Sequence, residues 1–209
     1  MVNGSDAARA RHWDEVYCSF GETGVSWFQP QPRVSLELLD ELGVGPAASV
    51  VDVGGGTSTL VDELLRRGFS RVCVLDVSAA ALDLARARLG GRADRVEWAR
   101  CDVLAWRPAR VYDVWHDRAM FHFLVEEADR RRYVQVLRGA IAPGGHVVLG
   151  VFAADGPDHC SSLPVARYDP AGLAAVIGEG FEAVLERREE HRTPAGALQP
   201  FTWLVMRHR

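Results

Sequence analysis

The sequence predicts an α/β fold, in which a doubly wound and mostly parallel sheet carries helices on both faces. Two observations support this prediction: short apolar runs rich in β-branched residues alternate with segments of helical periodicity, and glycines separate many of them. A third is the end of the chain, where two strand-like runs flank a Pro/Gly turn and predict an antiparallel pair. The 209 residues suffice for one sizeable core, so we expect a single domain over residues 1–209.

Two helices are expected before the first strand. Residues 6–17 form a short amphipathic pattern, and the glycines and prolines of "GETGVSWFQPQP" then predict a loop. Leu36, Leu39 and Leu42 share one face of a helix expected over Val34–Leu42, and a glycine follows that helix.

Strands and helices alternate from residue 49 onward. Ser49–Val53 is almost wholly apolar, as expected for a strand buried on both faces. Gly68 stands where a left-handed residue would end the following helix, and Ser78 can cap the next one. The expected strands are Ser49–Val53, Arg71–Leu75, Arg95–Ala99, Val111–Trp115 and His146–Phe152. The expected helices are Leu60–Arg67, Ser78–Leu89, Glu126–Ile141 and Pro170–Ile177.

The composition excludes several classes of function. The net charge of −4 argues against a nucleic-acid partner, which would require a basic face. All 24 basic residues are arginine, so lysine Schiff-base chemistry and a P-loop lysine are excluded. The four cysteines are widely spaced, which predicts neither a disulfide framework nor a metal site. The N-terminus is polar and no stretch could span a bilayer, so we expect a cytoplasmic protein without a membrane partner.

Three consecutive glycines, Gly54, Gly55 and Gly56, follow the first expected strand in "SVVDVGGGTSTLVDELL". Such a run lets the backbone approach a ligand closely, although a tight strand-to-helix turn would also use it. Acids stand at three successive strand ends: Asp52 just before the glycines, then Asp76 and Asp102. Each acid could instead cap a helix or loop, but the carboxyl ends of neighbouring parallel strands meet at one edge. The sequence therefore predicts an acid-ringed cleft there.

The identity of the ligand follows from what this loop lacks. The dinucleotide pattern G-x-G-x-x-G would require glycine where Thr59 stands, and Asp52 would repel a pyrophosphate. An acid-rich cleft suits a nucleoside that carries positive charge and free ribose hydroxyls. S-adenosylmethionine, whose demethylated product is S-adenosylhomocysteine, has these properties and is the expected cofactor.

The ordered motifs "VVDVGGGTS", "VLDVS", "CDV", "YDVWHDRAMFHFL" and "APGGHVVLGVF" resemble the class I S-adenosylmethionine-dependent methyltransferases. The resemblance runs from about residue 34 to the C-terminus and implies a Rossmann-like, seven-stranded sheet with an antiparallel terminal strand. One departure is Ser58, which stands where the family loop usually has its third glycine. The resemblance assigns the cofactor contacts residue by residue. The methionine part of the cofactor would contact Asp52 and Gly54 to Gly56, and its ribose would contact Asp76. Its adenine would contact Val77, Asp102 and Val103, and its reacting end would lie near His116.

The N-terminal segment "HWDEVYCSFGETGVSWFQPQP" is loosely similar to the segment before the core in thiopurine-type and elongation-factor lysine methyltransferases. There it looks like a lid over the cofactor. We therefore expect residues 1–33 to form an N-terminal helix and a lid-like segment, with Trp13, Trp27 and Gln29 near the cofactor. The alternative is that the tryptophans only anchor this helix to the core.

Methyl transfer is an in-line displacement that can proceed by positioning alone, so a catalytic side chain is not obligatory. His116 and Asp117 are the catalytic candidates. The alternative is an ion pair between Asp117 and Arg118, with His122 packed beneath it. Candidate substrate-binding residues are His122, Cys160, Arg167, Tyr168 and His191.

The expected function is methyl transfer to a small-molecule acceptor. A protein side-chain methyltransferase of the lysine type and a non-catalytic S-adenosylmethionine-binding protein are the alternatives. The sequence predicts neither the acceptor atom nor the oligomeric state.

Overall fold

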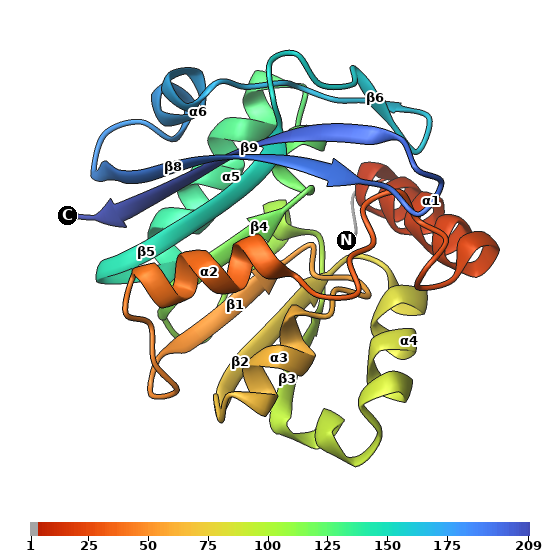
Figure 1. Ribbon diagram of the computed structural model, residues 1–209. Coiled ribbons are helices and arrows are strands. Elements are labelled where there is room, and N and C mark those ends of the chain that lie inside the picture. The colour runs from red at the N-terminus through yellow and green to blue at the C-terminus, as the bar shows by residue number, and fades with distance from the viewer. Residues whose placement is uncertain (1–3) are drawn as a thin grey trace.

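A seven-stranded sheet forms the centre of the computed structural model, which describes residues 4–209 (Figure 1). The strand order is β3-β2-β1-β4-β5-β9-β8. The strands are β1 Ser49–Val53, β2 Arg71–Asp76, β3 Val96–Arg100, β4 Tyr112–Arg118, β5 Ile141–Phe152, β8 Phe181–Arg192 and β9 Leu198–His208. The order reverses between β1 and β4, which makes their carboxyl ends the switch point where such sheets bind ligands.

The predicted fold class is confirmed. Strands β1 to β5 pair in parallel, and β9 is antiparallel to both of its neighbours, β5 and β8. The predicted antiparallel pair is β8 and β9, and it forms one edge of the sheet.

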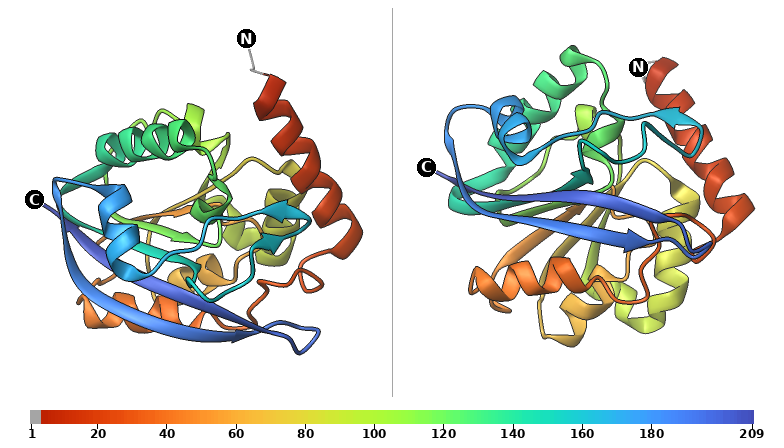
Figure 2. Two further views of the ribbon diagram at one scale, coloured as in Figure 1. Left: turned by 90° about the horizontal axis from the view of Figure 1, so that it is seen from above. Right: turned by 45° about the horizontal axis from the view of Figure 1, so that its top comes forward.

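Helices cover both faces of the sheet (Figure 2). The helices are α1 Gly4–Phe20, α2 Arg33–Glu41, α3 Leu60–Arg66, α4 Ala79–Leu89, α5 Glu127–Ala140 and α6 Pro170–Ile177. Leucines of α2 and α3 form one core with Val50 and Val114, whereas α5 and α6 form a second core with Val51 and Trp115. Alternate residues of β1 and β4 thus enter opposite cores, which explains why both strands are apolar throughout.

Three local predictions differ from the structure. The N-terminal helix is longer than residues 6–17, and the first three residues of the lid-like segment 1–33 lie outside the described part of the chain. Strand β5 begins at Ile141, so "APGG" lies within the strand as an irregularity between the pairs Tyr112–Ile141 and Val114–His146. A two-stranded hairpin, β6 His159–Cys160 and β7 Leu163–Pro164, occurs where a loop was expected.

The contact between β5 and β9 gives a test of core packing. Gly150 of β5 lies over the buried ring of Trp203, and a Cβ added at Gly150 would lie 2.9 Å from that ring. We expect Gly150→Ala to lower the free energy of unfolding by ~1–3 kcal/mol, because the packed ring has no room to move. Gly139→Ala is the matched control: its exposed helical site has nothing within 4 Å, so stability should rise by ~0.5–1 kcal/mol. Urea unfolding of both variants measures the difference, and equal effects would contradict the packing argument.

Candidate active site

The glycine loop has no room for side chains, because two neighbouring segments pack directly against its backbone. Gly54 and Gly56 have φ values of +65° and +47°, a region that favours glycine. A Cβ added at Gly54 would lie 2.5 Å from Cβ of Met120, and one at Gly56 would lie 2.4 Å from the hydroxyl oxygen of Tyr17. The loop therefore packs against the segment after β4 on one side and against α1 on the other.

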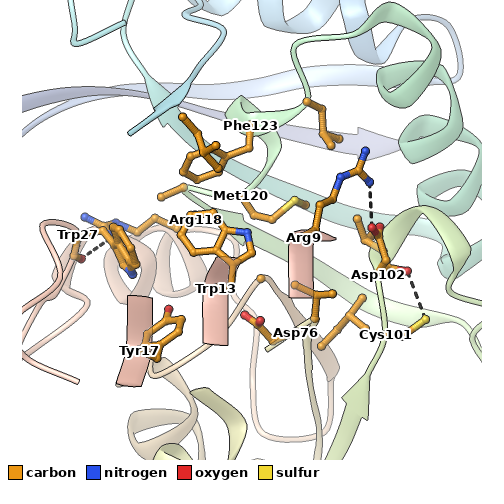
Figure 3. Close-up of a pocket in the computed structure, with 17 residues that line it drawn as sticks. Arg9, Trp13, Tyr17, Trp27, Asp76, Cys101, Asp102, Arg118, Met120 and Phe123 are labelled. Atoms are coloured by element: carbon orange, nitrogen blue, oxygen red, sulfur yellow. Dashed lines mark hydrogen bonds and ion pairs between the residues drawn. The ribbon is translucent and has the colours of Figure 1, made fainter. Parts of the chain in front are cut away.

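A cavity opens beside this loop at the carboxyl ends of β1 to β4 (Figure 3). Asp76 and Asp102, from the ends of β2 and β3, lie on one wall, together with the apolar side chains of Val77 and Val103. The other walls are mostly aromatic or apolar and come from α1, from the loop between α1 and α2, from the segment after β4 and from the β6–β7 hairpin. These wall residues are Trp13, Tyr17, Trp27, Met120, Phe123, Leu124 and Leu163.

Asp76 is buried, and its environment opposes its charge. The backbone N–H of Ser78 donates to Oδ1 over 2.8 Å, yet burial raises the pKa of Asp76 to about 6, with smaller contributions from the nearby acids Asp52 and Asp14. The hydroxyl of Ser78 also caps α4 by accepting from the backbone N–H of Ala81, as predicted. Asp76 thus faces the cavity as a carboxylate that hydrogen-bond donors of a ligand would stabilise.

Asp102 is paired with the N-terminal helix. Oδ1 accepts from the backbone N–H of Leu104, and Oδ2 accepts from Arg9 over 2.8 Å. Arg9 also contacts Asp129 at the start of α5, over 2.6 Å. Arg9 was not singled out by sequence reasoning, because nothing in a polar N-terminus indicates which of its arginines reaches the sheet edge.

Helix α1 closes one side of the cavity through several further contacts. The ring of Trp13 lies edge-on to Trp27 and Phe123, with centroid distances of 5.8 and 4.8 Å. Asp14 accepts from the Ser78 hydroxyl over 2.7 Å, which ties α1 to the first turn of α4. Gln29, the third predicted contact in this segment, lies away from the main cavity and donates to Glu189.

His116 sits in a buried chain of hydrogen bonds. Its Nδ1 donates to Asp52 Oδ1 over 2.7 Å, and its Nε2 lies 2.9 Å from the hydroxyl of Ser35 on α2. The three residue types match a Ser-His-Asp triad, but Ser35 is buried on a helix and its hydroxyl is already paired with His116. Both ring nitrogens of His116 are occupied, which leaves no free nitrogen to take a proton from an acceptor.

Asp117 points to the opposite face of β4. It accepts from the Tyr133 hydroxyl over 2.7 Å and from the backbone N–H groups of Met120 and Phe121. The alternative that paired Asp117 with Arg118 is wrong, because consecutive strand residues point to opposite faces. Arg118 instead donates to the carbonyl oxygen of Trp27.

The five predicted substrate-binding residues do not line the cavity of Figure 3. Buried His122 accepts from the backbone N–H of Phe152, and Cys160 packs near Ser26. The Arg167 side chain donates to a backbone carbonyl of its own loop, and the Tyr168 ring lies 5.8 Å from that of Phe121. His191 donates to the carbonyl oxygen of Ser26 over 2.7 Å. The segment after β5 that contains Cys160, Arg167 and Tyr168 does reach the cavity, but through Leu163 of the hairpin.

Comparisons with known proteins agree with this geometry. Residues 50–145 match the family model described as a methyltransferase domain. The chain is 30% identical over 113 residues to nodulation protein S of Rhizobium tropici, covering 54% of this chain and 47% of that protein. It is 32% identical over 81 residues to EEF1A lysine methyltransferase 2 of Mus musculus, covering 35% of this chain and 33% of that protein. The predicted resemblance to the class I S-adenosylmethionine-dependent methyltransferases is thus confirmed over residues 50–145.

Solved structures of other methyltransferases share the fold. A methyltransferase of Anabaena variabilis superposes with a TM-score of 0.77 at 18% identity, covering 99% of this chain and 96% of that one. The 1,6-didemethyltoxoflavin N1-methyltransferase of Burkholderia thailandensis, solved with its acceptor and S-adenosylhomocysteine, gives 0.74 at 21% identity, covering 100% and 91%. The chain spans about half the length of the nodulation protein and a third of the murine methyltransferase.

The site of this protein fits S-adenosylmethionine on structural grounds. The glycine loop has no room for side chains, and a buried carboxylate at the end of β2 faces the cavity, as a ribose diol would require. Among the described residues, no group of three or more His, Cys, Asp or Glu side chains is placed to hold a metal ion. Within the same residues, no helix has both the length and the apolar character needed to cross a membrane.

The buried carboxylate of Asp117 makes folding of this protein pH-dependent in a defined direction. Burial raises its pKa to about 6, so the folded protein binds this proton more tightly than the unfolded chain does. The stability that Asp117 contributes is therefore fully present below the unfolded pKa of 3.8 and is lost as the pH rises from there through 6. Relative to Asp117→Asn, the wild type should lose on the order of 2–3 kcal/mol between pH 4 and 7. Urea unfolding across this range measures the difference, and pH-independent differences would contradict it.

Proposed function

We propose that this protein transfers a methyl group from S-adenosylmethionine to a small-molecule acceptor. The observation that carries the proposal is the composition of the cavity: carboxylates on one wall face apolar side chains on the other. The acidic wall suits the nucleoside of the cofactor. Met120, Phe123, Leu124 and Leu163 form an apolar surface opposite it that suits a compact acceptor rather than an extended polypeptide.

Within this proposal, the residues of the cavity bind the cofactor and orient it. Asp76 accepts hydrogen bonds from the ribose hydroxyls, Val77 and Val103 flank the adenine, and Asp102 accepts from its amino group. The bound cofactor supplies an electrophilic methyl group on a sulfonium. Aromatic rings of Trp13 and Trp27 stabilise positive charge nearby by ~0.5–2 kcal/mol.

Neither predicted catalytic residue is free to act as a general base. Both nitrogens of His116 are engaged and Asp117 lies on the other face of β4, so we place both residues in supporting roles rather than in proton transfer. The acceptor would then react as a nucleophile that is already deprotonated, or lose its proton to water. Catalysis would rest on holding donor and acceptor in line in a dry cavity.

Incubation with methyl-labelled cofactor and a panel of thiols, amines, phenols, carboxylates and peptides tests the proposal. Label on a small molecule supports it and names the acceptor atom. Label on peptides only would favour the second candidate, a lysine-type protein methyltransferase, which is suggested by the similarity to EEF1A lysine methyltransferase 2. Cofactor binding without transfer to any acceptor class would favour a non-catalytic binding protein.

Asp76→Ala tests the ribose contact. Losing charge-assisted hydrogen bonds worth ~1.5–3 kcal/mol each should weaken S-adenosylhomocysteine binding at least tenfold in calorimetry. Because burial raises the pKa of Asp76 to about 6, wild-type affinity should also fall as the pH drops below 6, where the carboxyl takes up a proton. Asp76→Asn should abolish that pH dependence. Unchanged affinity in a folded variant would remove Asp76 from the ribose site.

Residues 1–33 serve, in our proposal, as a lid that closes over the cofactor. Trp13→Ala should weaken S-adenosylhomocysteine binding several-fold, because Trp13 forms a cavity wall, and cofactor should slow proteolysis between Gly21 and Gly24. Phe20→Ala is the matched control, since this aromatic side chain of the same helix is 61% exposed and lies outside the cavity. If Trp13→Ala lowers only the melting temperature, and the rate of proteolysis does not depend on the cofactor, the lid is refuted. The segment then only anchors the N-terminal helix to the core.

A further inference from the structure

A second, smaller pocket adjoins the cavity and shares Trp27, Gly54 and Arg118 with it. Its other walls are Gly55 of the glycine loop, the following Thr57–Thr59, Asp52, His116, Ser35 and the segment before α2. The two pockets thus adjoin at Gly54, and we call them together the trench. A ligand that fills the large cavity with its nucleoside would place its other end in the small pocket.

Arg118 lines both pockets, and Figure 3 shows it in the larger one. Its side chain is only 10% exposed. Nη1 donates to the carbonyl oxygen of Trp27 over 2.8 Å, and the guanidinium stacks 4.7 Å from the ring centre of Phe201. Nε and Nη2 have no hydrogen-bond partner among residues 7–209. Two buried donors without acceptors are costly, and such groups in native proteins usually await a ligand or water.

Glu189 does not satisfy these donors. Its nearest oxygen lies 4.0 Å from Nε of Arg118, beyond hydrogen-bond distance. Its two oxygens already accept from neutral donors, Oε1 from Gln29 over 2.7 Å and Oε2 from Trp203 over 2.8 Å. The guanidinium is thus held by the carbonyl of Trp27, the ring of Phe201 and the more distant charge of Glu189. Its Nε and Nη2 atoms form an edge that has no hydrogen-bond partner in the described part of the chain.

Asp52 presents the opposite charge in the same pocket. His116 holds Oδ1, while Oδ2 is buried and has no partner in the described part of the chain. Ser35 hydrogen-bonds to His116, and His116 hydrogen-bonds to Asp52, so this chain of contacts orients the carboxylate. The pocket therefore combines an unpaired cationic edge with an unpaired carboxylate oxygen, which is the pattern that a zwitterion complements.

We propose that the free edge of Arg118 binds the carboxylate of the cofactor's amino-acid end, and that Asp52 Oδ2 accepts from its ammonium group. Nε and Nη2 lie on one edge of a planar guanidinium and can bind both oxygens of a carboxylate. This assignment rests on the proposed function and adds to it, because the family resemblance places Asp52 near the methionine part but gives Arg118 no ligand.

The experiment compares two ligands that share a nucleoside. S-adenosylhomocysteine carries the α-amino acid, whereas 5′-methylthioadenosine lacks it. In calorimetry, Arg118→Gln should weaken S-adenosylhomocysteine binding at least tenfold and leave 5′-methylthioadenosine within twofold of wild type. Asp76→Asn is the matched control, because it should weaken both ligands by similar factors. Arg118→Lys keeps the charge but loses the two-pronged edge, so it should fall between wild type and Arg118→Gln.

Each other outcome overturns the assignment. Equal weakening of both ligands by Arg118→Gln would mean that Arg118 only supports the Trp27 segment. Unchanged S-adenosylhomocysteine affinity, with a raised KM for the acceptor, would assign Arg118 to the acceptor instead. If Arg118→Gln does not fold, the same ratio is read from Arg118→Lys, and a ratio equal to that of the wild type refutes the proposal. Wild-type protein that binds neither ligand would refute the proposed function itself, which separates the two failures.

Discussion

The absence of side chains between Val53 and Thr57 is the constraint on which the rest of the site depends. Met120 on one side and Tyr17 on the other approach the loop so closely that a single added carbon would collide with either. These contacts fix how near the segment after β4 and helix α1 come to the end of β1. They therefore set the width of the trench, the position of Gly54 along it and the depth at which Asp52 lies.

The same compact arrangement concentrates unfavourable electrostatics at the strand ends. Asp76 and Asp117 are buried carboxylates with raised pKa values, and burial lowers the pKa of His122 to about 3. Unpaired polar atoms on Arg118 and Asp52 add to this cost. Folding tolerates them because two apolar cores flank the sheet. A ligand that pairs with these groups would favour the folded state in proportion to its concentration.

Some residues of this site are placed by the backbone of the sheet, and these could be predicted from the sequence. Others are placed by the packing of distant elements, and these could not. The acids at the ends of β1, β2 and β3 were predictable, because parallel strands bring their carboxyl ends together. The direction of Arg118 was also available from the two-residue period of β4, although we first paired it with Asp117. Arg9 and Leu163 were not predictable, since they reach the cavity through the docking of α1 and of an unpredicted hairpin. The occupied nitrogens of His116 likewise depend on Ser35, a helix residue 81 positions away.

Helix α1 is synthesised before the residues that it contacts, and some of these partners follow much later in the chain. Asp14 contacts Ser78, which lies 64 positions further along the chain. Arg9 contacts Asp102 and Asp129, which lie 93 and 120 positions further along. Strand β4, which positions the segment against Gly54, also follows the loop by some sixty residues. Before residues 102 to 129 have been synthesised, Arg9 lacks both of its carboxylate partners, although Asp14 can already contact Ser78. The binding trench is therefore assembled only after α5 has begun to emerge, so a nascent chain acquires its fold and its ligand site at nearly the same moment.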